Sequence, residues 1–465
     1  MPQTNKNRTI RPNQNMKTIH VKHLLAGFGL LALNLQLHAQ DFALSSTPGV
    51  GRAPASVMAA DVNGYGKMDL ICANFNDATI TVLTNDGNGI LVSNVSYSTY
   101  PYPKTLVATD LNGDGKVDLA CVCTSGRLLV WTNNGSGNFV SVGSYATGSS
   151  APRSWITAAD INGDGKTDLI CQETDLKMLV LTNAGDGTFA TAPSPPGTTA
   201  GSWLVTAADV NGDGKLDLID IPYGGGNHYL RILTNAGNGN FILSSTNDDN
   251  TPWPGYMLAT DVNGDGKVDI FVSNYNSGSG KTVLVLTNDG TGLFGSNAVY
   301  TVDAGPISGA AVDVNGDGMV DLINGSFRGN LTILTNNGSS FGSNTTLNGV
   351  SSYPVSVTAA DVSGDGRLDL ITANNNNNNS PGTLSIWTNI LTFLPNLAVK
   401  RASNDVIVSW PSQWTGWAGW TLQQNTDLSS ANWTPCCGTI GDDGTTKSMT
   451  NSSSLGNLFF RLAHP

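Results

Sequence analysis

Aspartate, asparagine and glycine recur in one nine-residue string along this chain, and their spacing suits the binding of a metal ion. The copy at residues 110–118 reads DLNGDGKVD, with oxygen-bearing side chains at positions 1, 3, 5 and 9 and glycines at positions 4 and 6. Ca²⁺ accepts about six to eight such hard oxygen ligands in flexible geometry, whereas zinc prefers His or Cys. The glycines permit the left-handed turns that close so short a loop. The string therefore predicts a calcium loop, and the alternative is an Asp/Asn/Gly turn that holds no ion.

Seven copies of this loop occur in the chain, and they differ in ways that predict their metal affinity. The candidate ligands, with position 7 acting through its backbone carbonyl, are Asp61, Asn63, Lys67 and Asp69; Asp110, Asn112, Asp114, Lys116 and Asp118; Asp160, Asn162, Asp164, Lys166 and Asp168; Asp209, Asn211, Asp213, Lys215 and Asp217; Asp261, Asn263, Asp265, Lys267 and Asp269; Asp313, Asn315, Asp317, Met319 and Asp321; Asp361, Ser363, Asp365, Arg367 and Asp369. Tyr65 replaces the position-5 carboxylate of the first loop and is expected to weaken that site. We expect about six to seven Ca²⁺ ions, one per loop.

The loops divide the chain into repeats, because their first Asp residues are spaced by 48 to 52 residues. Each unit has a short apolar run before the loop, two β-rich segments after it, and a Gly/Asn turn before a further strand. Four short strands per unit indicate the blades of a propeller. The seventh unit lacks its last strand, but DFALSS at residues 41–46 matches NFILSS of another unit. We predict an all-β fold in which this N-terminal strand closes a seven-bladed propeller over residues 40–392.

The first 39 residues read as a signal peptide and are set apart from the fold. A start at Met16 gives the basic segment MKTIHVKH, the apolar run LLAGFGLLALNL and a cleavage site after Ala39, with residues 1–15 upstream of it. No later run is long enough to cross a bilayer, so we expect a secreted or cell-surface protein, with the periplasm as an alternative. Removing residues 1–39 changes the formal net charge from -12 to -17, which argues against a nucleic-acid partner.

General acid-base chemistry has few candidate residues in this sequence. The acidic residues are 34 Asp and the single Glu173, and only two of the five His residues, His228 and His464, follow residue 39. The Asp residues outside the loops are scattered among different units, and no nucleophile motif is present. We therefore expect no enzyme, and keep a polysaccharide-active lyase or hydrolase on a propeller scaffold as the alternative.

The run VTAADVNGDGKLDLI followed by LTNAGNGNF resembles the FG-GAP/VCBS repeat family, whose calcium-bearing blades are similar to those of integrin α-subunits. The resemblance covers residues 41 to about 392. It implies structural calcium ions between strands one and two of each blade, on one face, and ligand binding on the opposite face. Such propellers occur in adhesins, lectin-like proteins, enzyme accessory domains and secreted scaffolds, so the resemblance specifies the fold better than the function.

Aromatic residues recur in the segments that strand alternation places on the face opposite the calcium loops. The ligand-face candidates are Tyr223, Tyr229, Tyr275, Trp253 and Tyr102. Such side chains stack on sugar rings or anchor a protein partner. For Trp155 and Trp203, just before a first strand, the alternative is that they wedge between blades. We predict a monomeric binding or adhesion module for a glycan or an extracellular protein; a purely structural cell-surface component is a further alternative.

The cysteines and the C-terminal segment indicate structure rather than chemistry. Cys72, Cys121 and Cys171 occupy equivalent positions in the second strands of adjacent units and are expected in the core, while Cys123, Cys436 and Cys437 leave disulfides open. Residues 393–465 contain period-two strands rich in Trp, such as NDVIVSWPSQ and GWTLQQNTDL. They predict a small β-sandwich similar to a C-terminal module of secreted bacterial proteins.

Overall fold

The structure is a computed structural model that describes most of the chain from Asp41 to Ala463. The residues outside its description are 1–40, 88, 148–154, 173–177, 196–201, 223–228, 248–252, 339, 349–352, 376–379, 391–397, 403–404, 412–420, 426–433, 437–439, 443–445, 453–458 and 464–465. The predicted signal peptide and Tyr223 fall among them. Two compact units are present, one ending at Leu391 and one beginning at Thr392.

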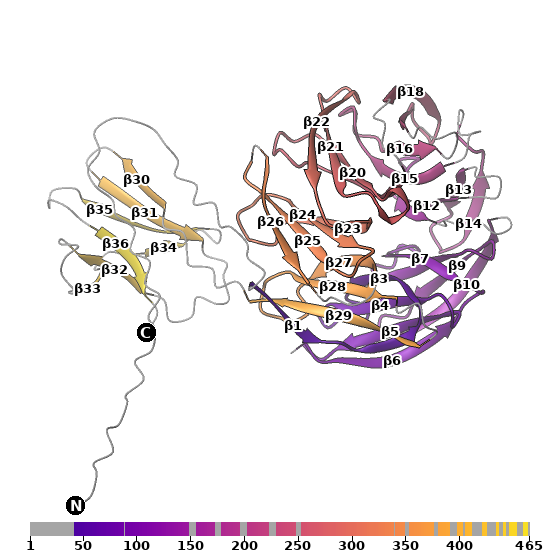
Figure 1. Cartoon of the computed structure of the whole chain (residues 1–465), viewed down its shortest axis with the longest axis horizontal. Helices are drawn as coiled ribbons and strands as arrows, with labels where there is room; N and C mark the ends of the chain where they lie inside the picture. The colour runs from indigo at the N-terminus through magenta and orange to yellow at the C-terminus, as the bar shows by residue number, and fades with distance from the viewer. Residues whose placement is uncertain are drawn as a thin grey trace, which may run out of the picture. The chain divides into compact units, whose positions relative to one another are not determined.

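The first unit is a ring of seven antiparallel sheets (Figure 1). Blades 1 to 3 are β3 (Pro54–Ala60), β4 (Asp69–Asn74), β5 (Thr79–Asn85) and β6 (Leu91–Ser98); β7 (Pro103–Thr109), β8 (Asp118–Cys123), β9 (Arg127–Asn133) and β10 (Phe139–Ala146); β11 (Ile156–Ala159), β12 (Asp168–Gln172), β13 (Met178–Asn183) and β14 (Phe189–Ala192). Blades 4 to 6 are β15 (Ser202–Ala208), β16 (Asp217–Pro222), β17 (Leu230–Asn235) and β18 (Phe241–Asn247); β19 (Pro254–Thr260), β20 (Asp269–Asn274), β21 (Thr282–Asn288) and β22 (Phe294–Thr301), with the 3-10 turn η4 (Asn276–Gly278); β23 (Pro306–Val312), β24 (Asp321–Ser326), β25 (Leu331–Asn336) and β26 (Phe341–Leu347). The first strands of successive blades contact one another around the whole ring.

The seventh blade confirms the predicted closure of the ring. It joins β27 (Pro354–Ala360), β28 (Asp369–Asn374) and β29 (Pro381–Asn389) to β1 (Phe42–Ser46) and β2 (Gly49–Arg52). Phe42 pairs with Asn389, as Phe139 pairs with Asn133 in blade 2. The N-terminal strand thus covers the outer edge of β29, which would otherwise expose unpaired backbone groups.

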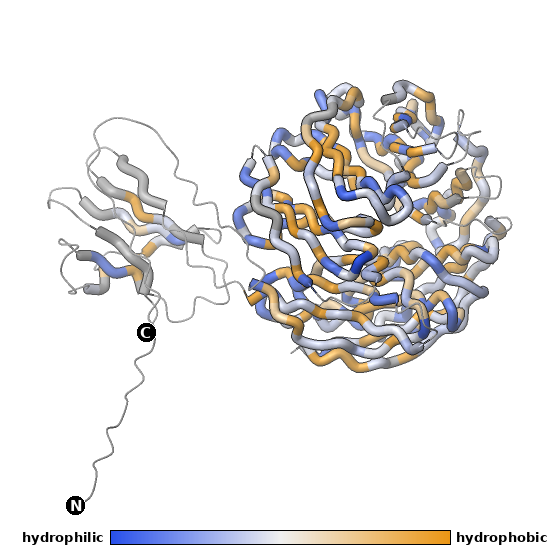
Figure 2. The backbone as a smooth tube through the Cα atoms, viewed as in Figure 1, coloured by the Kyte–Doolittle hydropathy of each residue, from blue (hydrophilic) through white to orange (hydrophobic). Residues whose placement is uncertain are grey.

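Burial is greatest in the second and third strands of each blade, and the first strands, such as β7, are partly half-buried. Second strands such as β4 and β8 are buried at every position, because neighbouring blades cover both of their faces. Fourth strands such as β10 alternate between exposed and half-buried residues. Apolar clusters fill the spaces between adjacent blades, and apolar residues lie along the strands in Figure 2. The core is therefore a set of interfaces between blades rather than one central mass.

The cysteines of the second strands lie in these clusters, as predicted. Cys121 and Cys123 belong to the cluster between blades 1 and 2, and Cys72 and Cys171 belong to others. Burial raises the pKa of the Cys72 thiol well above its usual range, which leaves it protonated and unreactive. Cys437 lies outside the described residues.

The second unit is all-β and consists of two antiparallel sheets. One contains β30 (Ala398–Ala402), β31 (Asp405–Pro411), β35 (Thr446–Ser452) and β34 (Ile440–Asp442); the other contains β33 (Thr434–Pro435), β32 (Thr421–Asn425) and β36 (Phe459–Ala463). Val408, Leu422 and Met449 are its buried apolar residues among those described. In neither unit do the described residues include a helix with the length and apolar character to cross a membrane.

Candidate functional site

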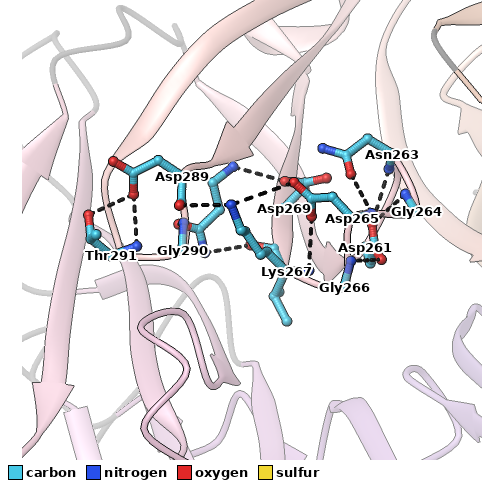
Figure 3. A network of polar contacts seen from close by, with 12 residues as sticks. Asp261, Asn263, Gly264, Asp265, Gly266, Lys267, Asp269, Asp289, Gly290 and Thr291 are labelled. Atoms are coloured by element: carbon cyan, nitrogen blue, oxygen red, sulfur yellow. Dashed lines mark hydrogen bonds and ion pairs between the residues drawn. The ribbon is translucent and has the colours of Figure 1, made fainter.

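The aspartate loops join the first and second strands of every blade and are held by their own side chains. In the fifth loop, shown in Figure 3, Asp261 accepts hydrogen bonds from the amides of Gly264 at 2.7 Å and Gly266 at 2.8 Å. Asn263 Oδ1 accepts from the amide of Asp265 at 2.8 Å. Gly264 and Gly266 have φ values of +76° and +81°, which only glycine adopts without strain. The residue types of the string thus fold the loop locally.

The Asp at position 9 has a different environment, because its carboxylate is buried and bonded on both oxygens. In all seven blades, one carboxylate oxygen accepts a hydrogen bond from the backbone N–H of the loop's position-2 residue, at 3.0 to 3.2 Å. The other accepts the backbone amide of the Asn that ends the third strand, at 2.7 to 2.9 Å. Burial raises the pKa of each of these carboxyl groups, and for Asp321 the pKa reaches about 7.

That Asn also connects neighbouring blades, a role which the sequence interpretation missed. Its Nδ2 donates to the position-2 carbonyl of the preceding blade's loop, at 2.6 to 2.9 Å in every blade. The donors are Asn85, Asn133, Asn183, Asn235, Asn288, Asn336 and Asn389. Asn85 of blade 1 reaches Val362 of blade 7, so the bonds form a closed circle. The available signal was the Asn that closes the third-strand pattern of every unit, as in LTN.

Cations at position 7 accompany the exposed carboxylates at position 5. Lys215 Nζ lies 3.1 Å from Asp213, and Lys116 Nζ lies 3.3 Å from Asp114. The backbone amide and the ammonium group of Lys215 lower the pKa of Asp213. The third, fifth and seventh loops contain the same pair, whereas the sixth loop has Met319 at position 7. The sixth loop is therefore the most acidic of the seven.

The donor set of the loops can be tested against a Ca²⁺ ion. Within the described ranges, no group of three Asp, Glu, His or Cys side chains is placed as it would be around a metal ion. The side-chain oxygens of the loops instead accept hydrogen bonds from backbone N–H groups. An ionised carboxylate has about four lone-pair directions, so each position-9 oxygen that accepts one amide retains another. Together with positions 1, 3 and 5 and the position-7 carbonyl, the donors are all hard oxygens and fit Ca²⁺ by chemistry. In the first loop, position 5 has no carboxylate, because it is Tyr65, whose side chain is 80% exposed.

The opposite face, called the ligand face below, surrounds a hollow on the ring axis. This axial hollow has a volume of about 550 Å³ and is lined mainly by first strands. One equivalent position, five residues before the first loop Asp, lines the hollow in all seven blades; it holds Ser56, Thr105, Trp155, Leu204, Tyr256, Ser308 and Ser356. Lys104 is the one charged side chain among its described lining residues. Its size falls within the range of about 300 to 1,000 Å³ that is typical of ligand sites.

The predicted ligand-face aromatics differ in exposure. Tyr102 and Trp253 are 49% and 41% exposed. Tyr275 and Tyr229 are half-buried rather than fully exposed, and Tyr275 packs edge-on against Phe327 with the ring centroids 6.1 Å apart. Trp155 and Trp203 are buried, 7% and 4% exposed, so they wedge between blades even though both border the axial hollow.

Three aromatic residues on this face have a strained backbone. Tyr102, Trp253 and Tyr353 directly precede the proline that begins a first strand, and their φ values are +65°, +55° and +66°. Ala53 and Gly305 occupy the same position in two other blades. A bulky residue in this left-handed region costs about 1 to 3 kcal/mol. The three aromatic side chains are therefore presented on the ligand face at an energetic cost.

Comparison with known proteins identifies the family. The FG-GAP-like repeat model matches residues 61–121, 110–171, 161–219, 261–324 and 313–372, and the chain belongs to this family. A search of curated proteins finds no match. Similar solved structures include BBS1N in complex with ARL6DN, with a TM-score of 0.51 and 12% identity over 75% of this chain and 96% of that one. Chaetomium thermophilum Raptor has a TM-score of 0.52 and 12% identity over 78% of this chain and 30% of that one. These likenesses show the fold alone.

Proposed function

We propose that this protein is an exported binding module that holds its ligand on the ligand face. The observation that carries the proposal is the axial hollow, lined by Tyr275, Phe327 and Tyr353, with the exposed rings of Tyr102 and Trp253 on the same face. Aromatic rings combined with a few polar groups recognise sugar rings or anchor a protein segment. The BBS1N structure, a fold neighbour, was determined in complex with ARL6DN, which supports a binding role for such a scaffold. The ligand is a glycan or an extracellular or cell-surface protein.

A catalytic role has less support at this site. The described lining of the axial hollow consists of aromatic, aliphatic, hydroxyl and amide side chains with Lys104. A lyase or hydrolase on this scaffold would need a proton donor and acceptor facing one substrate. Cleavage of a polysaccharide by the purified protein would replace the binding proposal with the enzymatic one.

We further propose that Ca²⁺ binds in the loops and has a structural role. Each ion would be held by side chains at positions 1, 3, 5 and 9 and by the position-7 carbonyl. The support is the all-oxygen donor set and the charge: the seven loops contain 20 Asp in a chain of net charge -12. An ion that binds only the folded chain raises its stability with concentration. EDTA should therefore lower the melting temperature and added Ca²⁺ should restore it, with elemental analysis giving about six ions per chain.

Variants of single loops test the calcium proposal more sharply. Tyr65→Asp restores the missing carboxylate of the first loop and should add about one ion per chain. Asp114→Asn should remove about one ion, and Val140→Thr, an exposed change on β10, is the matched control. The proposal would be contradicted by an unchanged ion count in both loop variants, or by a melting temperature that does not change when EDTA is added.

The ligand proposal is tested with the purified protein on a glycan array and in pull-downs from extracellular extracts. Binding that Tyr102→Ala and Trp253→Ala weaken supports the ligand face. Binding that these variants leave intact places the ligand elsewhere on the chain. The two substitutions remove exposed rings, so circular dichroism should show unchanged strand content.

A further inference from the structure

Among the described residues of the ligand face, basic side chains outnumber acidic ones, although the chain as a whole is acidic. Lys104 and Arg127 lie in blade 2, Arg328 lies in the turn between β24 and β25 of blade 6, and the exposed Lys281 directly precedes β21 of blade 5. Blades 6, 7, 1 and 2 are consecutive in the ring, because their first strands contact one another. In a chain of net charge -12, this excess of cations gives the described part of the ligand face a local positive potential.

Each cation stands beside aromatic rings. Lys104 Nζ is 6.0 Å from the ring centroid of Phe75, and the Arg127 guanidinium is 5.4 Å from that of Tyr100. Phe75 in turn packs against Tyr102, with the ring centroids 5.0 Å apart. A cation and a ring face so arranged offer an ionic contact and a stacking surface side by side.

Blade 6 repeats the combination. Arg328 lines a second hollow, of about 380 Å³, together with Phe327, Tyr353, Ser277 and Gly278. The rings of Phe327 and Tyr353 pack with their centroids 4.4 Å apart, and both residues also line the axial hollow. The two hollows therefore adjoin at these two rings.

The described carboxylates of this face are already engaged. Asp77 forms an ion pair with Arg52 at 2.5 Å. The Asp303 carboxylate accepts hydrogen bonds from Asn330 Nδ2 at 2.6 Å and from the backbone N–H of Ala304 at 2.8 Å. Neither residue lines either hollow.

We infer that the ligand is an anionic polysaccharide, bound along blades 6, 7, 1 and 2 with its sugar rings on Tyr102, Phe327 and Tyr353 and its acidic groups at Lys104, Arg127 and Arg328. This inference rests on the proposed binding function and specifies its ligand class. Adjoining hollows bordered by aromatic rings suit a linear chain of sugar rings better than a flat protein surface. The strain at Tyr102 and Tyr353 supports the same site, since Gly305 shows that the backbone there can do without a side chain.

The test is titration of the purified protein with polygalacturonate, dextran sulfate and neutral dextran at low and physiological salt. We expect both polyanions to bind at least about tenfold more tightly than dextran, and we expect physiological salt to weaken their binding. The comparison of the carboxylated with the sulfated probe distinguishes the two sources of negative charge. Poly-aspartate, which lacks sugar rings, should bind at least about tenfold more weakly than polygalacturonate.

Variants locate the binding and separate the two proposals. Arg127→Ala with Arg328→Ala should weaken polyanion binding at least about tenfold, and Tyr102→Ala should weaken it too, whereas Lys400→Ala with Lys447→Ala, which removes the same charge from β30 and β35 of the second unit, should leave it unchanged. Equal losses in the two charge variants would overturn the inference, as would dextran binding as tightly as the polyanions. Dextran binding that Tyr102→Ala weakens would overturn the anionic ligand while the binding module stands. A folded protein that binds none of the glycans but captures an extracellular protein would overturn the glycan class alone.

Discussion

The two faces of the propeller differ in how closely their residues and bonds repeat from blade to blade. On the face with the aspartate loops, the same bonds recur in seven blades, from the buried position-9 carboxylate to the Asn that reaches the preceding blade. On the ligand face, one backbone position holds Ala53, Tyr102, Trp253, Gly305 or Tyr353. Residues that recur in every repeat join the blades, whereas the residues at this fixed backbone position of the ligand face vary in size and chemistry. The predictions below test this division.

The largest effect is expected where blade 4 departs from the repeat inside the core. Asp220 and Arg231 form a buried ion pair, 0% and 2% exposed, where blades 2 and 3 have Cys and Leu. Asp220→Ala leaves the guanidinium buried without its carboxylate and should lower the free energy of unfolding by about 4 kcal/mol. Denaturant unfolding monitored by fluorescence measures it.

The double variant Asp220→Cys with Arg231→Leu is the matched control for this pair. It installs the pair found in blade 2 and should retain most of the wild-type stability, because a buried ion pair is seldom better than packed apolar residues. A double variant less stable than Asp220→Ala would show that the pair has a specific role beneath the ligand face.

The position-9 carboxylate should give the next largest effect. Asp118→Asn places an NH₂ group opposite one of two buried amide donors, Leu111 N or Asn133 N, and should cost about 3 kcal/mol in EDTA. Asp114→Asn, at the exposed position 5, should change stability by less than about 0.5 kcal/mol under the same conditions. Equal effects of the two substitutions would mean that position 9 is not part of the framework.

The sequence predicted the ring better than the bonds that hold it. The 19-residue interval from Phe42 to Asp61 matched the spacing in the other units, so the closing strand could be recognised before the structure was known. The partner of Asn133 Nδ2, the carbonyl of Val62, lies 71 residues away and depends on how blades pack. Likewise, spacing placed Tyr275 on a ligand-face connection but gave no sign that Phe327 would cover it.

A pH titration in EDTA should distinguish the acidic loop face from the ligand face by a smaller effect. Burial, together with the Asp317 and Asp313 carboxylates, raises the pKa of Asp321 from 3.8 to about 7. Between these values the folded chain retains a proton that the unfolded chain has released, so stability falls as pH rises from about 4 to about 7. The fall should be visible as a decrease in melting temperature across that pH range.

Met319→Lys tests the source of that slope. A lysine at position 7 gives the sixth loop the cation that five others pair with position 5, and should lower the pKa of Asp321 and flatten the profile. Met68→Lys, beside position 7 of the first loop, which lacks the position-5 carboxylate, is the control. An identical slope in wild type and Met319→Lys would place the pH dependence elsewhere.

The smallest effect concerns the strained backbone of the ligand face. Ala53 has φ +52° and only a methyl group to lose, so Ala53→Gly should raise the free energy of unfolding by about 0.5 to 1 kcal/mol. Gly305→Ala should lower it by at least about 1 kcal/mol, because the added Cβ would lie 2.8 Å from Phe327 Cβ.

Tyr353→Gly relieves strain but loses the contact with Phe327, so its stability should stay within about 0.5 kcal/mol of wild type. Polygalacturonate binding that weakens in this variant, and not in Ala53→Gly, would show that the strain is retained to present the ring; weakening in neither would assign Tyr353 to packing.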